Sequence, residues 1–492
     1  MFYSTTQLRR KVEQSGDKNL LSLYEQWLSK RKEVSKAYEM GEAKRKEKNI
    51  RIEVLLQEAD ELEKQISAGL AQKGIRAELT PQVRSWKEIQ QKLQANEALV
   101  EMTRIRYYDK SFTDSIIYVA LVVKKNSVYP EMVVFADGKV LERQKDNYRN
   151  RYIINKMSKE DKKSYKIFYE PLKRTLSGIE KIYFCSDGVY HQINLNTLYN
   201  AETGKYLMDE IEVQYVSTAR GFIELSKKSL KENLSSYQVH LFGYPDYSGG
   251  QQVSPSEGAN QEERSLAQSL RSRMNENNQR FYNSTIESVA LLPGTKTEVE
   301  KIYSIVKKNG MQCKVYLGLE ASEENLKSLS GVNILHIATH GFFFSGNSSK
   351  KEEYDNPLNR SGLLLAGAEV SFKGGVYGKE NGIVLSNEVM NLNLNGTDLV
   401  VLSACETGLG EVQSGEGVFG LQRSFQEAGA RNVVMSLWTV DDEATQRLMV
   451  EFYEELLNKK VSARQALKNS IQRIRQSYPE PYYWGAFVII GE

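Results

Sequence analysis

A histidine and a cysteine each follow directly on a short apolar run. Residues 333–339 (NILHIAT) lead into His340 and Gly341, and residues 398–404 (DLVVLSA) lead into Cys405. Apolar runs of this kind are typical of strands that are buried on both faces of a parallel sheet. Functional side chains of such sheets collect beyond the carboxyl ends of the strands. If the two strands are neighbours, His340 and Cys405 therefore face each other at one edge of the sheet.

This pair of side chains indicates acyl transfer through a thiol. A cysteine with a pKa of about 8.5 is mostly protonated at neutral pH, and only its thiolate is a good nucleophile. The imidazole of His340 can take the proton of Cys405 and later return it to a leaving amine. The backbone N–H groups of Gly341 and Cys405 are expected to form the oxyanion hole, since glycine lets the backbone approach closely.

The composition describes an ordinary soluble protein. Of 492 residues, 40% are hydrophobic and 26% are charged, which allows two to four domains with a sizeable core. The net charge is +3, so bulk charge gives no reason to expect a nucleic acid or a membrane surface as partner. The longest strongly apolar run, residues 116–123, is much shorter than the roughly 20 residues that span a membrane.

The cysteines and histidines exclude other kinds of site. Cys185, Cys313 and Cys405 are scattered and form neither a disulfide framework nor a CxxC pair, which favours a reducing cytoplasm. The N-terminus lacks the apolar stretch of a signal peptide. Cysteines and histidines do not cluster at the spacing of zinc ligands, so we expect no metal and no cofactor.

The chain is expected to have three parts. Residues 1–105 look helical, with apolar residues at 52, 55, 59, 62 and 66 on one helix face. This face predicts either a helix packed on the next domain or a short coiled-coil pair, and the region is an interaction segment or the end of a repeat array. In residues 106–290 and again in 291–492, strands alternate with helices, which indicates α/β structure with a largely parallel sheet. Residues 418–428 are predicted to be a helix that ends at Gly429.

Two polar segments interrupt the α/β pattern. Residues 247–284 and 345–360 are rich in Gly, Ser, Asn, Gln, Glu and Lys and hold too few apolar side chains to fold alone. We expect mobile loops there. Because they flank the His340 and Cys405 segments in the sequence, one hypothesis is that an activating protein or complex must order them.

Several motifs resemble those of the CHAT family of caspase-like cysteine peptidases. The segments ILHIATHG (334–341) and LVVLSACETG (399–408) resemble its two signatures. The family belongs to the same broad clan as caspases, separase, clostripain and gingipains. Further matches span residues 100–492: SDGVYHQI (186–193), YVSTAR (215–220), LPGT (292–295), SGLLLAG (361–367), GEGVFGL (415–421), SLWTVDDEAT (436–445) and YYWGAF (482–487).

The resemblance implies a fold and a catalytic pair. The expected fold is a caspase-like three-layer α/β sandwich with a mainly parallel central sheet, preceded by the helical region. Because the family's catalytic histidine precedes a glycine, the resemblance implies His340 as base and Cys405 as nucleophile, and it leaves His336 as a structural histidine. Residues 291–492 would be the catalytic half. Residues 106–290 would be the N-terminal part, a candidate degenerate half in which Cys185 ends a strand without a matching His-Gly.

The implied function is a regulated cysteine endopeptidase that cleaves a specific protein partner, in bacterial defence or programmed death. The alternative is a latent or silent caspase-like scaffold for protein interactions. Caspase-type enzymes hold one preferred residue in a pocket, and a basic preference needs an acid there. Asp441 and Asp442 are candidates, although aspartate at this point also caps a helix. Trp438 is predicted to line the substrate groove or to lie in the core.

Overall fold

The computed structural model describes residues 5–39, 45, 49–75, 85–135, 137–154, 161–224, 236–250, 282–283, 288–344, 357–373, 375, 378–405, 407–413 and 417–491. Most of these residues are organised around one sheet of 11 strands. Across the sheet the strands are β11 (Gln312–Gly318), β8 (Gln238–Pro245), β12 (Ile334–Ala338), β16 (Leu399–Ser403), β19 (Asn432–Ser436), β20 (Phe487–Gly491), β7 (Glu212–Val216), β4 (Lys181–Cys185), β1 (Glu97–Asp109), β2 (Ser111–Lys124) and β3 (Glu131–Phe135).

The sheet consists of two parallel blocks joined by an antiparallel step. The strands from β11 to β19 run parallel to one another, as do those from β20 to β1. β19 and β20 are antiparallel, and the β1–β2–β3 meander at the far edge is also antiparallel. β8, which precedes residue 291, lies between β11 and β12 and so belongs to the block that carries His340 and Cys405.

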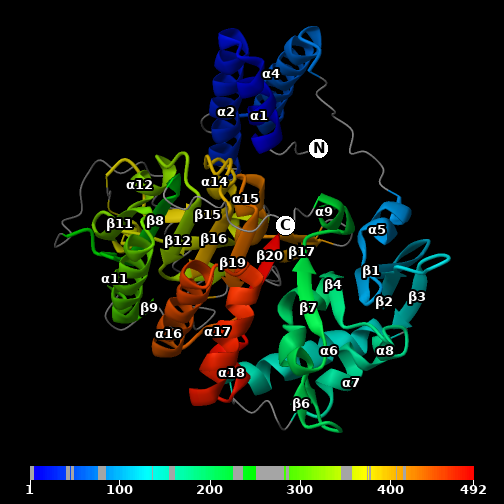
Figure 1. Ribbon diagram of the computed structural model, residues 1–492. Helices are drawn as coiled ribbons and strands as arrows, with labels where there is room; N and C mark the ends of the chain where they lie inside the picture. The colour runs from blue at the N-terminus through cyan, green and yellow to red at the C-terminus, as the bar shows by residue number, and fades with distance from the viewer. Residues whose placement is uncertain are drawn as a thin grey trace.

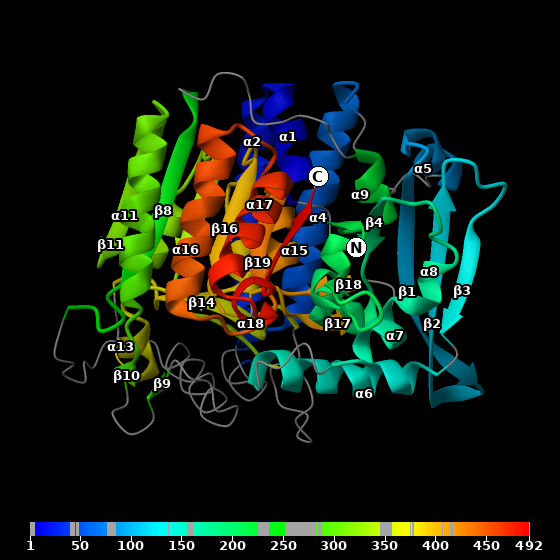
Figure 2. The same ribbon diagram turned by 60° about the horizontal axis from the view of Figure 1, so that its bottom comes forward.

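Helices cover both faces of the sheet, as the two views show (Figure 1, Figure 2). On one face of the first block lie α11 (Pro293–Lys308), α16 (Asp442–Tyr453) and α17 (Ala463–Ser477). The opposite face carries α14 (Ser386–Val389) and α15 (Leu421–Glu427). The second block lies between α6 (Gly138–Arg149), α7 (Ser164–Phe168) and α8 (Glu170–Lys173) on one side and α5 (Trp86–Lys92) and α9 (Ala219–Glu224) on the other. The predicted three-layer α/β sandwich with a mainly parallel sheet is confirmed.

The remaining regular elements are short. They are the helices α12 (Glu323–Lys327), α13 (Ala368–Phe372) and α18 (Pro481–Trp484), the π-helical turns η1 (Asn150–Ile154) and η8 (Glu454–Asn458), and the 3-10 turns η3 (Gly188–Gln192), η4 (Leu195–Thr197), η5 (Leu207–Asp209) and η7 (Pro357–Asn359). Small antiparallel sheets pair β5 (Tyr199–Asn200) with β6 (Lys205–Tyr206), β9 (Tyr282–Asn283) with β10 (Ser288–Val289), β17 (Glu411–Gln413) with β18 (Gly417–Phe419), and β13 (Gly341–Phe343) with β14 (Ser361–Leu364) and β15 (Ile383–Leu385).

The N-terminal helices are α1 (Thr5–Ser15), α2 (Lys18–Glu39) and α4 (Ile52–Gln72), and they stand above the sheet in Figure 1. The predicted apolar face of α4 packs on α2: Ala59 and Ile66 are buried in one cluster with Trp27. The face therefore forms a helix pair rather than a contact with the α/β domain. The expectation of helix up to residue 105 is wrong at its end, because β1 begins at Glu97 and pairs with β2 and β4.

The helix predicted over residues 418–428 is shorter than expected. β18 occupies Gly417–Phe419, and α15 begins only at Leu421. Gly420 between them has an extended backbone, and a Cβ there would lie 2.7 Å from the carbonyl oxygen of Leu409. The close passage of these two segments ends the hairpin and delays the start of the helix.

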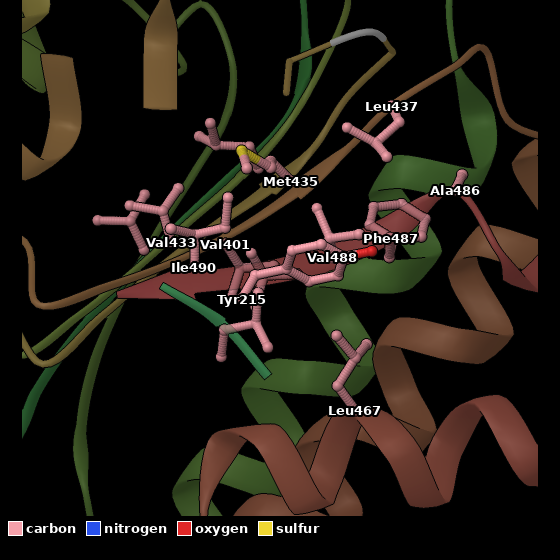
Figure 3. Close-up of a cluster of buried hydrophobic side chains, with 14 of the residues drawn as sticks. Tyr215, Val401, Val433, Met435, Leu437, Leu467, Ala486, Phe487, Val488 and Ile490 are labelled. Atoms are coloured by element: carbon pink, nitrogen blue, oxygen red, sulfur yellow. The ribbon is translucent and has the colours of Figure 1, made fainter. Parts of the chain in front are cut away.

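One arginine bridges the two blocks where β20 meets β7. These strands share a single ladder pair, Ile490 with Tyr215. The guanidinium of Arg464 on α17 donates to the carbonyl oxygens of Tyr215 (3.2 Å), Ile489 (3.1 Å) and Gly491 (2.7 Å). Apolar side chains of β19, β20 and α17 pack around the same junction (Figure 3). Arg464 therefore supplies hydrogen bonds across the junction that the short ladder does not.

We predict that Arg464→Met lowers the free energy of unfolding by about 2–4 kcal/mol, because three carbonyl groups lose a charged donor. Chemical denaturation monitored by circular dichroism measures the loss. The matched control is Arg447→Met on α16, an exposed arginine paired with Glu443 in the preceding turn, for which we expect a change of no more than about 0.5 kcal/mol. Equal effects of the two substitutions would contradict the bridging role.

Candidate active site

The register between β12 and β16 brings the two reactive residues together. Their parallel ladder runs from Ile334 opposite Leu399 to Ala338 opposite Ser403. Both strands are buried along their whole length. Two further residues along each chain lead to His340 and Cys405, so these residues leave the sheet at the same level from neighbouring strands.

The turns that carry the pair touch each other at Gly341. A Cβ built on Gly341 would lie 2.5 Å from the carbonyl oxygen of Cys405 and 2.8 Å from Cγ2 of Thr407. Real Cβ atoms do not approach backbone this closely, so a larger residue would push the two turns apart. This contact gives a physical reason for glycine directly after the histidine.

The backbone of Gly341 has an N–H that lies outside the β13–β14 ladder. Leu364 N–H donates to His340 O (3.0 Å) and Phe344 N–H donates to Arg360 O (2.8 Å). With this pattern Gly341 and Leu363 form a non-hydrogen-bonded pair, whose N–H groups point away from the partner strand. The geometry is compatible with Gly341 N–H as an oxyanion donor, and this role, like that of Cys405 N–H, stays a prediction.

β19 fixes the turn around Cys405, a partially exposed thiol. Ser436, the last residue of β19, donates its hydroxyl to Ala404 O (2.5 Å) and its N–H to Oγ1 of Thr407 (3.1 Å). Its carbonyl accepts the N–H of Gly408 (2.7 Å). Ala404, Thr407 and Gly408 are therefore all anchored to one serine. The sequence analysis did not single out Ser436, although the motif SLWTVDDEAT begins there.

His340 is almost enclosed and is oriented by a backbone carbonyl. His340 is 4% exposed, and its Nε2 lies 2.6 Å from the carbonyl oxygen of Ala290. A carbonyl only accepts, so Nε2 carries the proton and Nδ1 keeps its lone pair. Burial lowers the pKa of His340 to about 4, and the Ala290 carbonyl acts in the opposite direction. The imidazole is thus neutral at physiological pH.

His336, the competing histidine, is a buried structural residue. It is fully enclosed, with Nε2 2.9 Å from Oε1 of Glu298 and Nδ1 3.4 Å from the hydroxyl of Tyr453. Burial raises the pKa of Glu298, while its contact with His336 acts the other way. Both nitrogens of His336 therefore face groups of the core, an ion-pair distance from Glu298 and a hydrogen-bond distance from Tyr453.

The two aspartates proposed for a substrate pocket both contact helix starts. Asp441 caps α16 by accepting the N–H of Ala444 (3.0 Å). Asp442 accepts the N–H of Gly294 (2.9 Å) at the start of α11, and burial raises its pKa. These contacts explain the aspartates structurally. A substrate-binding role for either carboxylate remains a prediction.

Trp438 does not line a groove in this structure. It is 0% exposed, and its indole N–H donates to Tyr482 O (3.1 Å). Its ring packs edge to face against Tyr148 at a centroid distance of 6.3 Å. The prediction of a substrate contact is therefore corrected to a core position, because the side chain is held inside by packing and by a hydrogen bond.

The other candidate groups add no second site. Burial raises the pKa of Cys185 and raises that of Cys313 to about 12, as expected of unreactive thiols. Among the described residues, the one group of carboxylates close enough to hold a metal ion is Glu323, Glu380 and Glu388. Nζ of Lys327 lies 2.6–2.8 Å from an oxygen of each, so an internal ammonium already balances them.

Some predictions fall on residues that the structure does not describe. Most of the two predicted polar loops, at 251–281, 284 and 345–356, lies outside the described residues. Among the helices that the structure describes, none is long and apolar enough to cross a bilayer.

Residues 162–492 match the family model of the CHAT domain. The chain belongs to the CHAT-domain family. Among curated proteins it resembles tetratricopeptide repeat protein 28 of Homo sapiens, with 27% identity over 196 residues, and that of Mus musculus, with 31% identity over 110 residues. These matches cover 36% and 22% of this CHAT-domain chain but only 8% and 4% of the relatives, so the chain spans a small part of their length.

Two solved structures show weak similarity to this CHAT-domain protein. The Arg-specific cysteine proteinase gingipain R aligns at 10% identity and a TM-score of 0.35, over 71% of this chain and 75% of that one. Separase from Saccharomyces cerevisiae, in its complex with securin, aligns at 11% identity and a TM-score of 0.37, over 67% of this chain and 17% of that one.

The low pKa of His340 predicts a pH dependence of stability. Between pH 6.5 and about 4 the unfolded imidazole binds a proton and the folded one resists it, so stability falls as pH falls through this window. The difference between wild type and His340→Gln in unfolding free energy should change by about 3 kcal/mol from pH 7 to pH 4. Denaturant titrations across this range measure it. A flat difference curve would mean that His340 titrates normally.

The contact of Gly341 with Cys405 predicts that Gly341→Ala distorts the site. We expect a loss of stability of about 1–3 kcal/mol from the forced separation of the two turns, together with an altered rate of Cys405 alkylation by iodoacetamide. The control is Gly221→Ala in α9, where a Cβ meets nothing closer than 3.4 Å. An unchanged alkylation rate in Gly341→Ala would show that the turns tolerate the added methyl.

Proposed function

We propose that this protein is a cysteine endopeptidase in which Cys405 is the nucleophile and His340 the general base. The observation that carries the proposal is the in-register ending of β12 and β16, with the turns of His340 and Cys405 in contact at Gly341. Membership of the CHAT-domain family supports the same class of chemistry. A positioned thiol beside an oriented imidazole is the arrangement that nucleophilic acyl transfer requires.

The electrostatics favour proton transfer during attack over a preformed ion pair. With a pKa of about 4, His340 is neutral and offers the Nδ1 lone pair. The Cys405 thiol passes its proton to Nδ1 as sulfur attacks the scissile carbonyl carbon, and the imidazolium then protonates the leaving amine. The Ala290 carbonyl, which accepts from Nε2–H, stabilises the positive ring. Water then hydrolyses the thioester, with His340 again as base.

A protein substrate and an activating partner belong to this proposal. His340 is only 4% exposed, so a substrate carbonyl needs a rearrangement to approach its Nδ1 and Cys405 together. That enclosure supports an enzyme held latent until a protein or complex opens the site. The expected setting, a reducing cytoplasm and a role in bacterial defence or programmed death, is part of the same proposal.

The enclosure of His340 also supports a second candidate, a silent CHAT scaffold that binds proteins without cleaving them. The two readings differ in the reactivity of Cys405. A scaffold has no need of an imidazole whose tautomer is fixed beside a thiol, and for this reason we favour the peptidase.

Covalent probes test the proposal directly. We expect acyloxymethyl-ketone peptides that differ only in the P1 residue to label wild-type protein at Cys405, with one P1 residue preferred. Labelling should fall at least about 100-fold in Cys405→Ala and in His340→Ala, because each removes an essential partner. The control is Cys313→Ala, which removes another partially exposed thiol and should label like wild type.

The P1 preference then tests the aspartates. A basic preference that Asp442→Asn or Asp441→Asn weakens would assign a pocket acid, whereas an acidic or apolar preference would leave both as helix-start residues. If the wild type stays unlabelled in buffer and in cell lysate with partners present, the scaffold is the better description.

A further inference from the structure

A buried tyrosine lies against the face of His340. Tyr247 follows β8 and is 1% exposed, and its ring centroid lies 5.4 Å from that of His340, with the planes tilted by 36°. Its backbone is also held, since Tyr247 O accepts the N–H of Glu369 (3.0 Å). The ring therefore has a fixed position behind the imidazole.

The hydroxyl of Tyr247 joins a directed series of hydrogen bonds. Thr339 Oγ1 donates its single proton to Leu364 O (2.5 Å), so in its 2.9 Å contact with Tyr247 it must be the acceptor and the phenol the donor. The backbone N–H of His340 in turn donates to the phenol oxygen. Leu364 N–H closes the loop by donating to His340 O (3.0 Å).

Two groups therefore restrain His340 in complementary ways. The Ala290 carbonyl holds Nε2 at 2.6 Å and fixes the tautomer. Tyr247 contacts the ring face and, through its hydroxyl, the backbone from which the ring projects. Cys405 is near enough for its charge to influence the phenol of Tyr247. A shift of the ring would move Nδ1 relative to the sulfur.

We propose that Tyr247 is a positioning residue, which keeps the imidazole of His340 in the orientation that presents Nδ1 to Cys405. The proposal rests on the proposed function, because it assigns Tyr247 a part in the same proton transfer. Tyr247 itself touches no reacting atom. A buried tyrosine that merely filled space would leave the chemistry of Cys405 unchanged when its hydroxyl is removed, and this difference can be measured.

The chain offers a closely matched control. Tyr316 on β11 is also a buried tyrosine beside a histidine, His240, with ring centroids 5.8 Å apart and Oη 3.1 Å from Nδ1. This pair lies at the β8–β11 edge of the sheet, away from the ends of β12 and β16. Tyr316→Phe therefore removes a comparable hydroxyl without touching His340.

The experiment is iodoacetamide alkylation of Cys405 as a function of pH, followed by mass spectrometry, in wild type, Tyr247→Phe, Tyr316→Phe and His340→Ala. We expect Tyr247→Phe to lose about 10-fold or more of the alkylation rate at pH 7, approaching His340→Ala, with a pH profile moved toward that of a free thiol at about 8.5. Tyr316→Phe should match wild type. On a peptide chosen by the probe panel, kcat should fall about 10- to 100-fold with KM nearly unchanged.

The outcomes separate the two proposals. Tyr247→Phe that alkylates and turns over like wild type overturns the positioning role and leaves the peptidase intact. Failure of every peptide, in buffer and in cell lysate with partners present, with Tyr247→Phe still resembling His340→Ala in alkylation, supports positioning and contradicts the peptidase. If His340→Ala alkylates like wild type, both fall. If Tyr247→Phe does not fold, Thr339→Val removes the acceptor of the same hydroxyl and must change the profile in the same direction.

Discussion

The parallel pairing of β12 with β16 is the constraint on which the site depends. Both strands are buried on both faces, so a register shift of one residue would turn every side chain to the opposite face of the sheet. The register is therefore fixed by packing along the whole strand, far more strongly than by the reactive residues themselves. His340 and Cys405 need only follow the last paired residues to arrive side by side. The contact of Gly341 with the Cys405 turn then sets their separation.

Enclosure of His340 gives the site its electrostatic character. Removing an imidazole from water disfavours its charged form, and a single backbone carbonyl restores part of that loss. The imidazole is consequently neutral at physiological pH. During attack, negative charge would develop on the carbonyl oxygen of a bound substrate. Stabilisation of that charge by oxyanion donors would make proton transfer from the thiol to the imidazole favourable at that point. A neutral imidazole at rest is thus compatible with the base role proposed for His340.

The sequence predicted the parts of the site that depend on local patterns. The apolar runs before His340 and Cys405 defined β12 and β16 within a residue or two, and the motifs identified the family. The hydrogen bond from His340 to the Ala290 carbonyl could not be predicted, because every residue has a backbone carbonyl whatever its side chain. Tyr247 was also missed, since it is far from His340 in sequence and was expected to begin a mobile polar loop, whereas it is buried. Helix was assigned up to residue 105 because the region is rich in Lys, Glu, Gln and Leu. The pairing of β1 depends on β2 and β4, which come later in the sequence.

The junction between the two blocks is linked physically to the turn around Cys405. β20 pairs with β19 from Asn432 opposite Gly491 to Ser436 opposite Phe487. Ser436 is also the residue whose hydroxyl, N–H and carbonyl hold the turn around Cys405. The same strand, β20, is tied to β7 by one ladder pair and by Arg464. A displacement of the second block must therefore act on β20, which pairs directly with β19, the strand whose Ser436 holds the turn around Cys405. β20 thus helps to order the candidate site although it contributes neither His340 nor Cys405.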